Sequence, residues 1–493
     1  MGIVAVSEDR GVTEARDFRE RRWLALGLLC TAQFVVVLDA SIVNVALPSI
    51  GTALSFSQEN LSWVVNAYVL TFGGFLLLGG RLADLLGRRR VFMFGLVLFA
   101  LASLAGGFAE SEGMLIGARA VQGLGAAILS PAALSIVTTT FRDGAERNKA
   151  LGVWGAVAGS GGAAGVLLGG VLTDGLGWEW VLWVNVPIGI AAAAIAPTLV
   201  AESRSESGTR SFDLGGALSV TAGLSVMVYA LVDATDAGWG STQTIGLLAL
   251  AVVLLATFVA IELRSDSPLV PFRIFRIRTL TGANVVGILI GASLFSMFFF
   301  ISLYMQQVLG YSAIKAGLSY LPLALTIILT AGVASQLVTK VGFKPVLAAG
   351  MVFIAAGLVW FGQVSVDGSF ASDILGPSLL AAIGLGLAFV TSTIAAVSGV
   401  DEHEAGLASG LINTSQQVGG ALGLAVLATV ANSTTNDATG SPAQALTDGF
   451  QNAFLAGAGI ALLGLVATLV LIRSSDSRAH VALGSGQAAG EQA

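Results

Sequence analysis

Long apolar runs separated by short polar segments recur along the whole chain of 493 residues. Each run is long enough to cross roughly 30 Å of hydrocarbon as an α-helix. The pattern therefore predicts an all-α integral membrane protein with 14 transmembrane helices. The runs lie at about 23–49, 60–79, 91–110, 114–138, 149–173, 180–200, 213–233, 243–263, 279–308, 315–338, 345–365, 373–399, 405–431 and 450–472.

The segments that join these runs differ in lysine and arginine content from one side of the predicted membrane to the other. Cytoplasmic segments of membrane proteins carry an excess of both residues. Lys315, at the end of a run, is the one basic residue on the predicted outer side. We therefore expect the N- and C-termini to lie in the cytoplasm. The outer segments without lysine or arginine are 50–59, 174–179, 234–242, 366–372 and 432–449.

The composition fits a chain that lies in lipid. Charged residues make up 11% of the chain, against roughly a quarter in soluble proteins. The single cysteine, Cys30, excludes an intramolecular disulfide, and His403 and His480 form no cluster with metal-ligand spacing. We expect no metal and no cofactor. No nucleophile–base constellation supports an enzyme, and no phosphate-binding G-x-x-x-x-G-K-[ST] motif supports ATP-driven pumping.

A stretch rich in glycine and arginine joins the second and third runs. It reads G-G-R-L-A-D-L-L-G-R-R-R over 79–90, so that a short loop holds four arginines and one aspartate. Such charge places the loop at the cytoplasmic surface, where its glycines let two helix ends approach closely. The stretch resembles the gate-latch motif between helices 2 and 3 of major facilitator superfamily transporters. The resemblance implies a cytoplasmic gate of Gly80, Asp84, Gly87, Arg88 and Arg89.

A weaker copy of this motif lies in the second half, at 335–344, with Thr339 in the place of Asp84. Two such halves fit a parallel-repeat transporter. The seventh and eighth runs resemble the extra pair of the fourteen-helix drug:proton antiporter branch. We therefore expect the major facilitator fold, with two six-helix lobes plus two extra central helices. The expected divisions are a cytoplasmic N-terminal tail at 1–22, the N-terminal lobe at 23–200, the additional helices at 213–263, a cytoplasmic linker at 264–278, the C-terminal lobe at 279–472 and a disordered cytoplasmic tail at 473–493.

A single acid, Asp39, lies in the middle of the first apolar run. A charge at that depth costs roughly 2.5–3.5 kcal/mol on insertion scales. Burial disfavours the charged form of a carboxyl, which suits a group that takes up and releases a proton. The surrounding L-D-A-S-I-V-N-V-A-L-P resembles the first-helix signature of the fourteen-helix antiporters. Asp39 is therefore a candidate for proton coupling, and the alternative is a permanently paired structural carboxylate.

Arg119 is the natural counterpart of Asp39, because it lies inside the fourth run. Arginine stays charged, so its side chain must face a cavity, an acid or a carbonyl. Gln122 shares its helical face. The stretch resembles the family's R-x-x-Q-G-x-G-a-a motif, which is linked there to proton transfer. The alternative is an arginine that only ties its helix to neighbouring backbone, and the sequence leaves open whether Arg119 reaches Asp39.

The fifth run carries small residues four positions apart, a spacing that lets two helices pack backbone to backbone. It resembles the antiporter motif of drug exporters. Val166 stands where that family has a kink-forming proline, and Glu179 stands where it usually has arginine. The resemblance implies close helix packing at Gly155, Gly159, Gly165, Gly169 and Gly170.

Candidates for a substrate cavity are polar and aromatic residues spread over several runs. Aromatic and methionine-rich surfaces suit promiscuous apolar ligands, although such clusters in a membrane helix more often face lipid or pack. The last six runs hold no acid at mid-membrane depth, so a preference for divalent cationic drugs is not expected. The candidates are Asn44, Tyr68, Gln122, Phe295, Tyr304, Asn413 and Gln416.

Together these features favour a secondary active transporter over an enzyme. The resemblance implies multidrug efflux by alternating access, in which protons exchange for hydrophobic drugs, antibiotics or dyes. Proton-coupled or facilitative uptake of a small organic solute is an alternative that the missing proline keeps open. A non-transporting membrane sensor or assembly partner is a second alternative. We expect a monomeric, multi-pass protein in the lipid bilayer of the bacterial inner (cytoplasmic) membrane, with no nucleic-acid partner.

Overall fold

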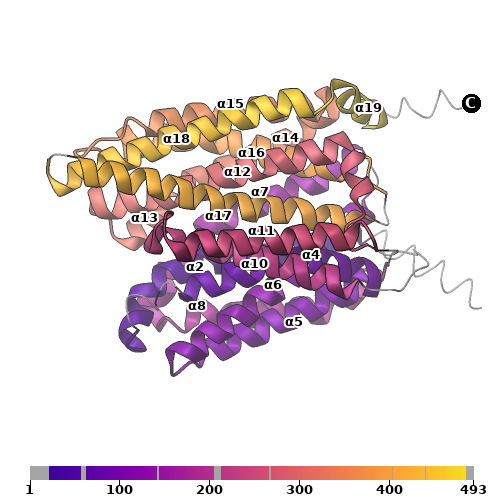
Figure 1. Cartoon of the computed structure of the whole chain (residues 1–493), viewed down its shortest axis with the longest axis horizontal. Helices are drawn as coiled ribbons and strands as arrows, with labels where there is room; N and C mark the ends of the chain where they lie inside the picture. Colours follow the sequence, from indigo (N-terminus) through magenta and orange to yellow (C-terminus); the bar gives the residue numbers. More distant parts are fainter. Residues whose placement is uncertain are drawn as a thin grey trace, which may run out of the picture.

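The computed structural model describes residues 21–56, 61, 63–141, 144–204, 213–265, 268–401, 404–438 and 440–484. Within these ranges the regular structure is helical and no strand occurs. The long helices run roughly along one direction of the molecule (Figure 1). The predicted all-α architecture is confirmed.

The first half of the chain forms one helical bundle. Its helices are α2 (Arg22–Ala53), α4 (Trp63–Leu86), α5 (Arg88–Gly107), α6 (Glu112–Thr140), α7 (Ala145–Leu176), α8 (Trp180–Trp183) and α9 (Asn185–Leu199). Both α4 and α5 pack along α6, while α2 packs along α7 and also contacts α6 and α9. In this bundle, the N-lobe, α2 and α6 carry Asp39 and Arg119 and contact each other.

The second half forms a similar bundle, the C-lobe. Its elements are α12 (Arg278–Leu303) with η2 (Tyr304–Val308), α13 (Ala313–Ser319), α14 (Leu321–Val341), α15 (Phe343–Phe361), η3 (Phe370–Leu375), α16 (Gly376–Val397), α17 (Ala405–Asp437), α18 (Pro442–Leu471) and α19 (Ser474–Gly484). Here α12 packs along α17, and α15 packs along α16 and α18.

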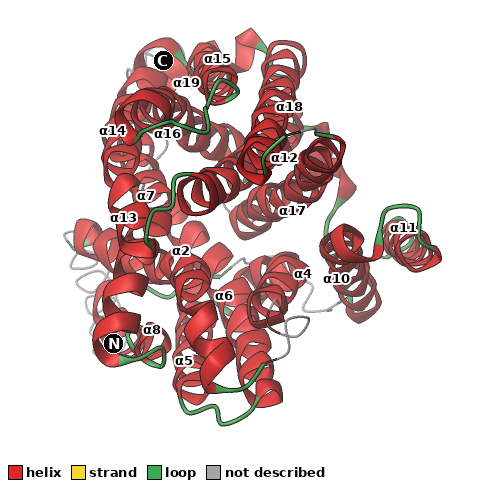
Figure 2. Cartoon of the chain, turned by 90° about the vertical axis from the view of Figure 1, so that its left-hand side faces the viewer, coloured by secondary structure: helices red, strands yellow, loops and turns green. Residues whose placement is uncertain are grey.

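Two long pairs of helices join the lobes. One is α7 with α14, and the other is α4 with α17. Figure 2 shows the N-lobe helices α4, α5 and α6 on one side and α12, α15, α16, α17 and α18 on the other. Helices α10 (Leu214–Ala237) and α11 (Thr242–Glu262) lie beside this joint, where α10 contacts both α4 and α17. A short 3-10 helix, η1 (Phe272–Arg276), leads into the C-lobe.

Thirteen helices of the described chain are long and apolar enough to cross a membrane. The predicted seventh span is α10, whose apolar part, Gly215–Leu231, is shorter than the others. The multi-pass prediction is therefore confirmed, whereas the count of fourteen and the sides of the termini remain predictions. Helix α7 runs unbroken for 32 residues, which agrees with the absence of a proline at Val166.

Two expectations from the sequence are wrong. The stretch 79–90 is not a loop, because α4 continues to Leu86 and α5 begins at Arg88, leaving Gly87 alone between them. Its φ of +108° explains why a single residue can reverse the chain and why that residue is glycine. The polar tail is not wholly disordered either, because α19 packs against α14 and α15. Residues 1–20 and 485–493 of the predicted tails, and His403, lie outside the described residues.

Candidate functional site

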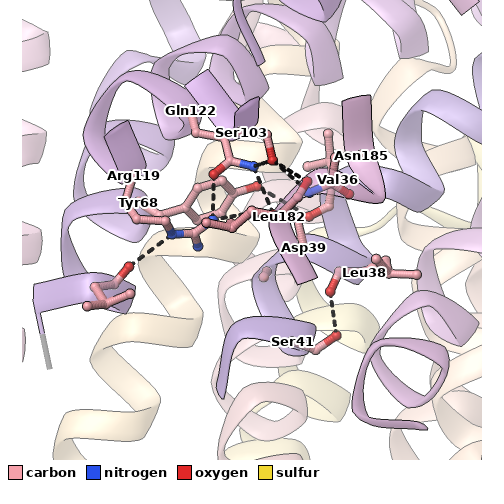
Figure 3. Close-up of polar contacts among 12 residues, drawn as sticks. Val36, Leu38, Asp39, Ser41, Tyr68, Ser103, Arg119, Gln122, Leu182 and Asn185 are labelled. Carbon is pink, nitrogen blue, oxygen red and sulfur yellow. Dashed lines mark hydrogen bonds and ion pairs between the residues drawn. The ribbon is translucent and has the colours of Figure 1, made fainter. Parts of the chain in front are cut away.

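Asp39 lies fully buried in the middle of α2 and is held by three side chains from two other helices. Arg119 on α6 donates from Nη1 to Oδ2 at 2.5 Å. Gln122, one turn further along α6, donates from Nε2 to Oδ1 at 2.8 Å, and Asn185 on α9 donates to the same oxygen at 2.7 Å (Figure 3). The structure thus brings Arg119 to Asp39, a contact that the sequence left open.

The guanidinium of Arg119 is enclosed on several sides, and its side chain is 1% exposed. Its Nε donates to the Val64 carbonyl at 3.0 Å, and its carbon Cζ lies 4.4 Å from the centre of the Tyr68 ring. The Tyr68 hydroxyl donates in turn to the Val36 carbonyl at 3.2 Å. A buried ion pair of this kind is costly to break by removing one partner, because the other charge is left buried and uncompensated.

Two of the side chains that bond Asp39, Gln122 and Asn185, are themselves bonded by Ser103. The Ser103 hydroxyl on α5 accepts hydrogen bonds from Gln122 at 3.0 Å and Asn185 at 3.1 Å, and it donates to the Leu182 carbonyl at 2.8 Å. Asn185 and Ser103 were not among the site residues predicted from the sequence. The sequence did offer a signal for Asn185, a polar residue in the V-N-V-P-I-G stretch that opens the sixth apolar run. It offered none for Ser103, a small hydroxyl residue within the third apolar run.

The glycines after Gln122 let α6 pack close enough to α4 and α5 for its polar side chains to reach the Asp39 cluster. A methyl group at Gly125 would lie 2.7 Å from the Phe99 backbone nitrogen on α5. One at Gly123 would overlap the Tyr68 carbonyl on α4. Only a hydrogen fits at either position, so α6 can approach both neighbours closely. The R-x-x-Q-G-x-G pattern therefore supplies both the polar groups and the short distances that the cluster requires.

A second buried acid, Asp84, lies near the end of α4 and joins the two lobes. Its Oδ1 accepts from Arg88 Nη2 at 2.9 Å, and its Oδ2 accepts from the backbone N–H of Leu407 at 3.1 Å. Leu407 is the third residue of α17, so the carboxylate faces the positive end of a C-lobe helix. Gly80 permits this contact, because a methyl there would lie 2.7 Å from the Gly406 carbonyl.

The remaining arginines of the motif contact a different partner, within the N-lobe. Arg89 and Arg90 lie 3.7 Å and 3.6 Å from the Glu202 carboxylate, which follows α9. The backbone N–H of Arg89 also donates to Glu202 at 3.2 Å. The motif therefore divides into an interlobe contact through Asp84 and an intralobe contact through the start of α5.

The glycines of α7 face different neighbours along the helix. Gly165 and Gly169 face α2, and a methyl at Gly169 would lie 2.8 Å from the Ile42 carbonyl. On the other side, Gly155 faces Val390 of α16 and Gly170 faces Ile314 of α13. Helix α7 therefore contacts helices of both lobes. Gly159 lies in the same helix, but its surroundings are outside the description.

The substrate-cavity candidates fall into separate places. Tyr68 and Gln122 belong to the Asp39 cluster. Tyr304 is instead buried in the C-lobe, where its hydroxyl donates to the Ser365 carbonyl at 2.6 Å and lies 3.5 Å from Asp373. Asn44 is exposed, and its amide donates to the Ala40 carbonyl of its own helix.

The other three candidates lie on the α12–α17 pair. Phe295 is 41% exposed and lies against Gly420. Asn413 bonds the Ser409 carbonyl of its own helix, and the buried Gln416 packs against Gly291. Among the described residues, no group of three or more His, Cys, Asp or Glu side chains could hold a metal ion.

Comparison with known proteins identifies the family of the chain. The family model described as "Major Facilitator Superfamily" matches residues 29–424. The cephamycin export protein CmcT of Amycolatopsis lactamdurans is 44% identical over 450 residues, which cover 91% of this chain and 92% of the relative. The puromycin resistance protein pur8 of Streptomyces alboniger is 39% identical over 478 residues, covering 95% and 94%.

A solved structure supports the same fold. The proton:xylose symporter XylE superposes with a TM-score of 0.65 over 91% of this chain and 95% of that chain, at 13% sequence identity. At that identity the likeness concerns the fold alone. The match of the family model and the identity to full-length relatives, together with the paired lobes and the motif around Asp84, place this chain in the Major Facilitator Superfamily.

Proposed function

We propose that this protein exports small, partly hydrophobic molecules from a bacterial cell in exchange for protons. One observation carries the proposal: among the residues that the structure describes, the buried Arg119 guanidinium is the one charged group that bonds the buried Asp39 carboxylate. Protonation of Asp39 would end this ion pair and leave the positive charge of Arg119 buried without its anionic partner. That state is unfavourable, so the helices that carry the two residues would gain by repacking. A change of this kind links proton occupancy to the packing of α2, α6 and α9, as alternating access requires.

The direction and the substrate class are inferred from the relatives. One is named for cephamycin export and another for puromycin resistance, so we infer antibiotic-like organic molecules leaving the cell. The basic ends of the helices, including the Asp84 contact, would then lie in the cytoplasm. We infer a monomer in the cytoplasmic membrane, with the latch between Asp84 and α17 holding the cytoplasmic side closed while the substrate leaves.

The proposal can be tested in everted membrane vesicles that hold an imposed proton gradient, acid inside. Puromycin, a cephamycin and ethidium are added in turn while the gradient is followed with an acridine dye. We expect at least one compound to release protons in the wild type and none to do so in Asp39→Asn. Asp174→Asn, which changes an exposed acid at the end of α7, serves as the matched control and should behave as wild type.

Three outcomes would count against the proposal. Proton release that persists in Asp39→Asn would remove Asp39 from the coupling step. Substrate movement without proton release in the wild type would indicate facilitated transport. Accumulation of substrate outside the everted vesicles, in the direction that corresponds to uptake by the cell, would favour the alternative of nutrient import.

A further inference from the structure

Two helix junctions, one in each lobe, are built alike at the end of the molecule that carries the arginine motif. In the N-lobe, Gly87 joins α4 to α5, and the first N–H groups of α5 are bonded by residues that follow α9, the last helix of that lobe. The N–H of Arg88 donates to the Ser203 carbonyl at 2.8 Å, and that of Arg89 donates to Glu202 at 3.2 Å.

The C-lobe repeats this arrangement with α19. Gly342, with a φ of +85°, joins α14 to α15. The N–H of Lys344, the second residue of α15, donates to the Ser477 hydroxyl at 3.1 Å. Ser477 follows α18, the last long helix of its lobe. Helix α19 therefore occupies the position that the segment around Glu202 occupies in the N-lobe.

The interlobe contacts of the two junctions differ in charge. In the N-lobe, Asp84 accepts the Leu407 N–H at the start of α17. In the C-lobe, the corresponding residue is Thr339, whose hydroxyl accepts from Asn148 Nδ2 at 2.9 Å. Asn148 lies at the start of α7, as Leu407 lies at the start of α17. The second contact thus has no carboxylate, and a neutral hydrogen bond is roughly half as strong as a charge-assisted one.

His480 of α19 enters this second contact. Its ring nitrogen Nε2 lies 3.1 Å from Nδ2 and 3.2 Å from Oδ1 of Asn148, and Nδ1 lies 3.3 Å from the Ser398 hydroxyl. The ring also packs at an edge against Phe343. His480 is 7% exposed and Asn148 is 1% exposed, so water does not compete freely for these groups. A C-lobe helix therefore holds an N-lobe side chain.

We propose that α19 is the second latch of the transport cycle, in which His480 takes over the interlobe role that the missing carboxylate would play. The helix is well placed for this, because Asp476 accepts from Thr279 of α12 at 2.7 Å and Ser477 bonds the start of α15. Helix α19 is thereby fixed to the C-lobe, and its His480 reaches Asn148 of the N-lobe. When this end opens, that contact must break together with the one between Asp84 and Leu407.

The proposal assumes alternating access, as in the proposed function, but its test needs neither substrate nor a proton gradient. Spin labels are placed at Ala145→Cys on α7 and Lys340→Cys on α14, both exposed, in a Cys30→Ala background that removes the single native cysteine. Interlabel distances are measured in proteoliposomes. Failure of this test would leave proton exchange through Asp39 untouched, because the two rest on different residues and different readouts.

We expect His480→Ala to raise the ratio of long to short interlabel distances about fivefold, the effect of losing one buried hydrogen bond. Asn148→Ala should raise it at least as much, and the double variant should match Asn148→Ala, because the two residues form one contact. His480→Gln, whose amide can still reach Asn148, should restore the wild-type ratio. Arg478→Ala changes an exposed residue of the same helix and serves as the matched control.

Two results would overturn the proposal. One is a distance distribution in His480→Ala equal to that of wild type and Arg478→Ala. The other is a double variant whose effect is the product of the two single effects, which would mean that His480 and Asn148 act independently. If His480→Ala does not give a monodisperse protein, Asn148→Ala and His480→Gln decide the question, since the first lies in the other lobe and the second keeps a polar side chain.

Discussion

The carboxylate of Asp84 on α4 accepts a hydrogen bond from the backbone N–H of Leu407, 323 positions further along the chain. The same carboxylate bonds Arg88, and both side chains are almost fully buried. One acid therefore compensates an arginine of its own lobe and the positive end of a helix in the other lobe. Its two partners are of different kinds, so a change at Asp84 affects both the stability of the N-lobe and the closure of the interlobe joint.

We expect Asp84→Asn to weaken closure of this end. The amide keeps the size of the side chain but removes the charge that Arg88 and the start of α17 require, at a cost of about 3–5 kcal/mol when a buried partner is left uncompensated. The apparent Tm of the purified protein should fall, and transport should fall with it. Asp174→Asn is the control, and an unchanged Tm in Asp84→Asn would contradict the structural role assigned to this contact.

Variants of Asp39 and Arg119 should couple strongly. Either Asp39→Asn or Arg119→Gln leaves one buried charge alone and should cost about 3–5 kcal/mol of stability. The double variant removes both charges and should be more stable than the two single effects predict, while remaining inactive in proton exchange. A double-mutant cycle on Tm measures this interaction. Additive effects would mean that the ion pair does not govern the stability of the N-lobe.

Removal of the Asn185 amide should weaken the Asp39 cluster without removing its ion pair. The amide Nδ2 of Asn185 donates to the Asp39 carboxylate at 2.7 Å and to the Ser103 hydroxyl at 3.1 Å. Asn185→Ala should therefore lower the stability of the protein by about 1.5–3 kcal/mol, the usual contribution of a hydrogen bond to a charged group. Thermal unfolding of the purified protein measures this loss. A Tm equal to that of wild type would mean that Asn185 does not help to hold Asp39.

Two glycines of α7 allow a matched test of close packing. A methyl at Gly165 would lie 2.7 Å from the Leu38 carbonyl and would overlap the Ser41 hydroxyl, whereas one at Gly162 meets nothing within 4 Å. Gly165→Ala should lose about 1–3 kcal/mol through overpacking. Gly162→Ala should gain up to about 1 kcal/mol from helix propensity. Thermal unfolding measures both, and equal shifts would mean that α7 does not pack tightly on α2.

The sequence predicted the helices well, because length and hydropathy set each membrane span. It also named Asp39 and Arg119 as candidates for proton coupling, because a buried charge demands a partner, but it left open whether the two side chains touch. It missed Ser103, a single hydroxyl whose role depends on which helices meet there. It also missed α19, because a short polar helix is stabilised by its contacts with Thr279, Lys344 and Asn148 and carries little signal of its own.

Proton release by the purified protein is the most direct test of the central claim, that Asp39 exchanges its proton when substrate binds. A compound that releases protons from the vesicles is added to wild type and to Asp39→Asn in weakly buffered detergent solution, and the change in pH is recorded against a protein-free blank. We expect the wild type to release protons in proportion to protein concentration and Asp39→Asn to release none. Binding of that compound to the wild type with no proton release, or equal release by both proteins, would contradict the account.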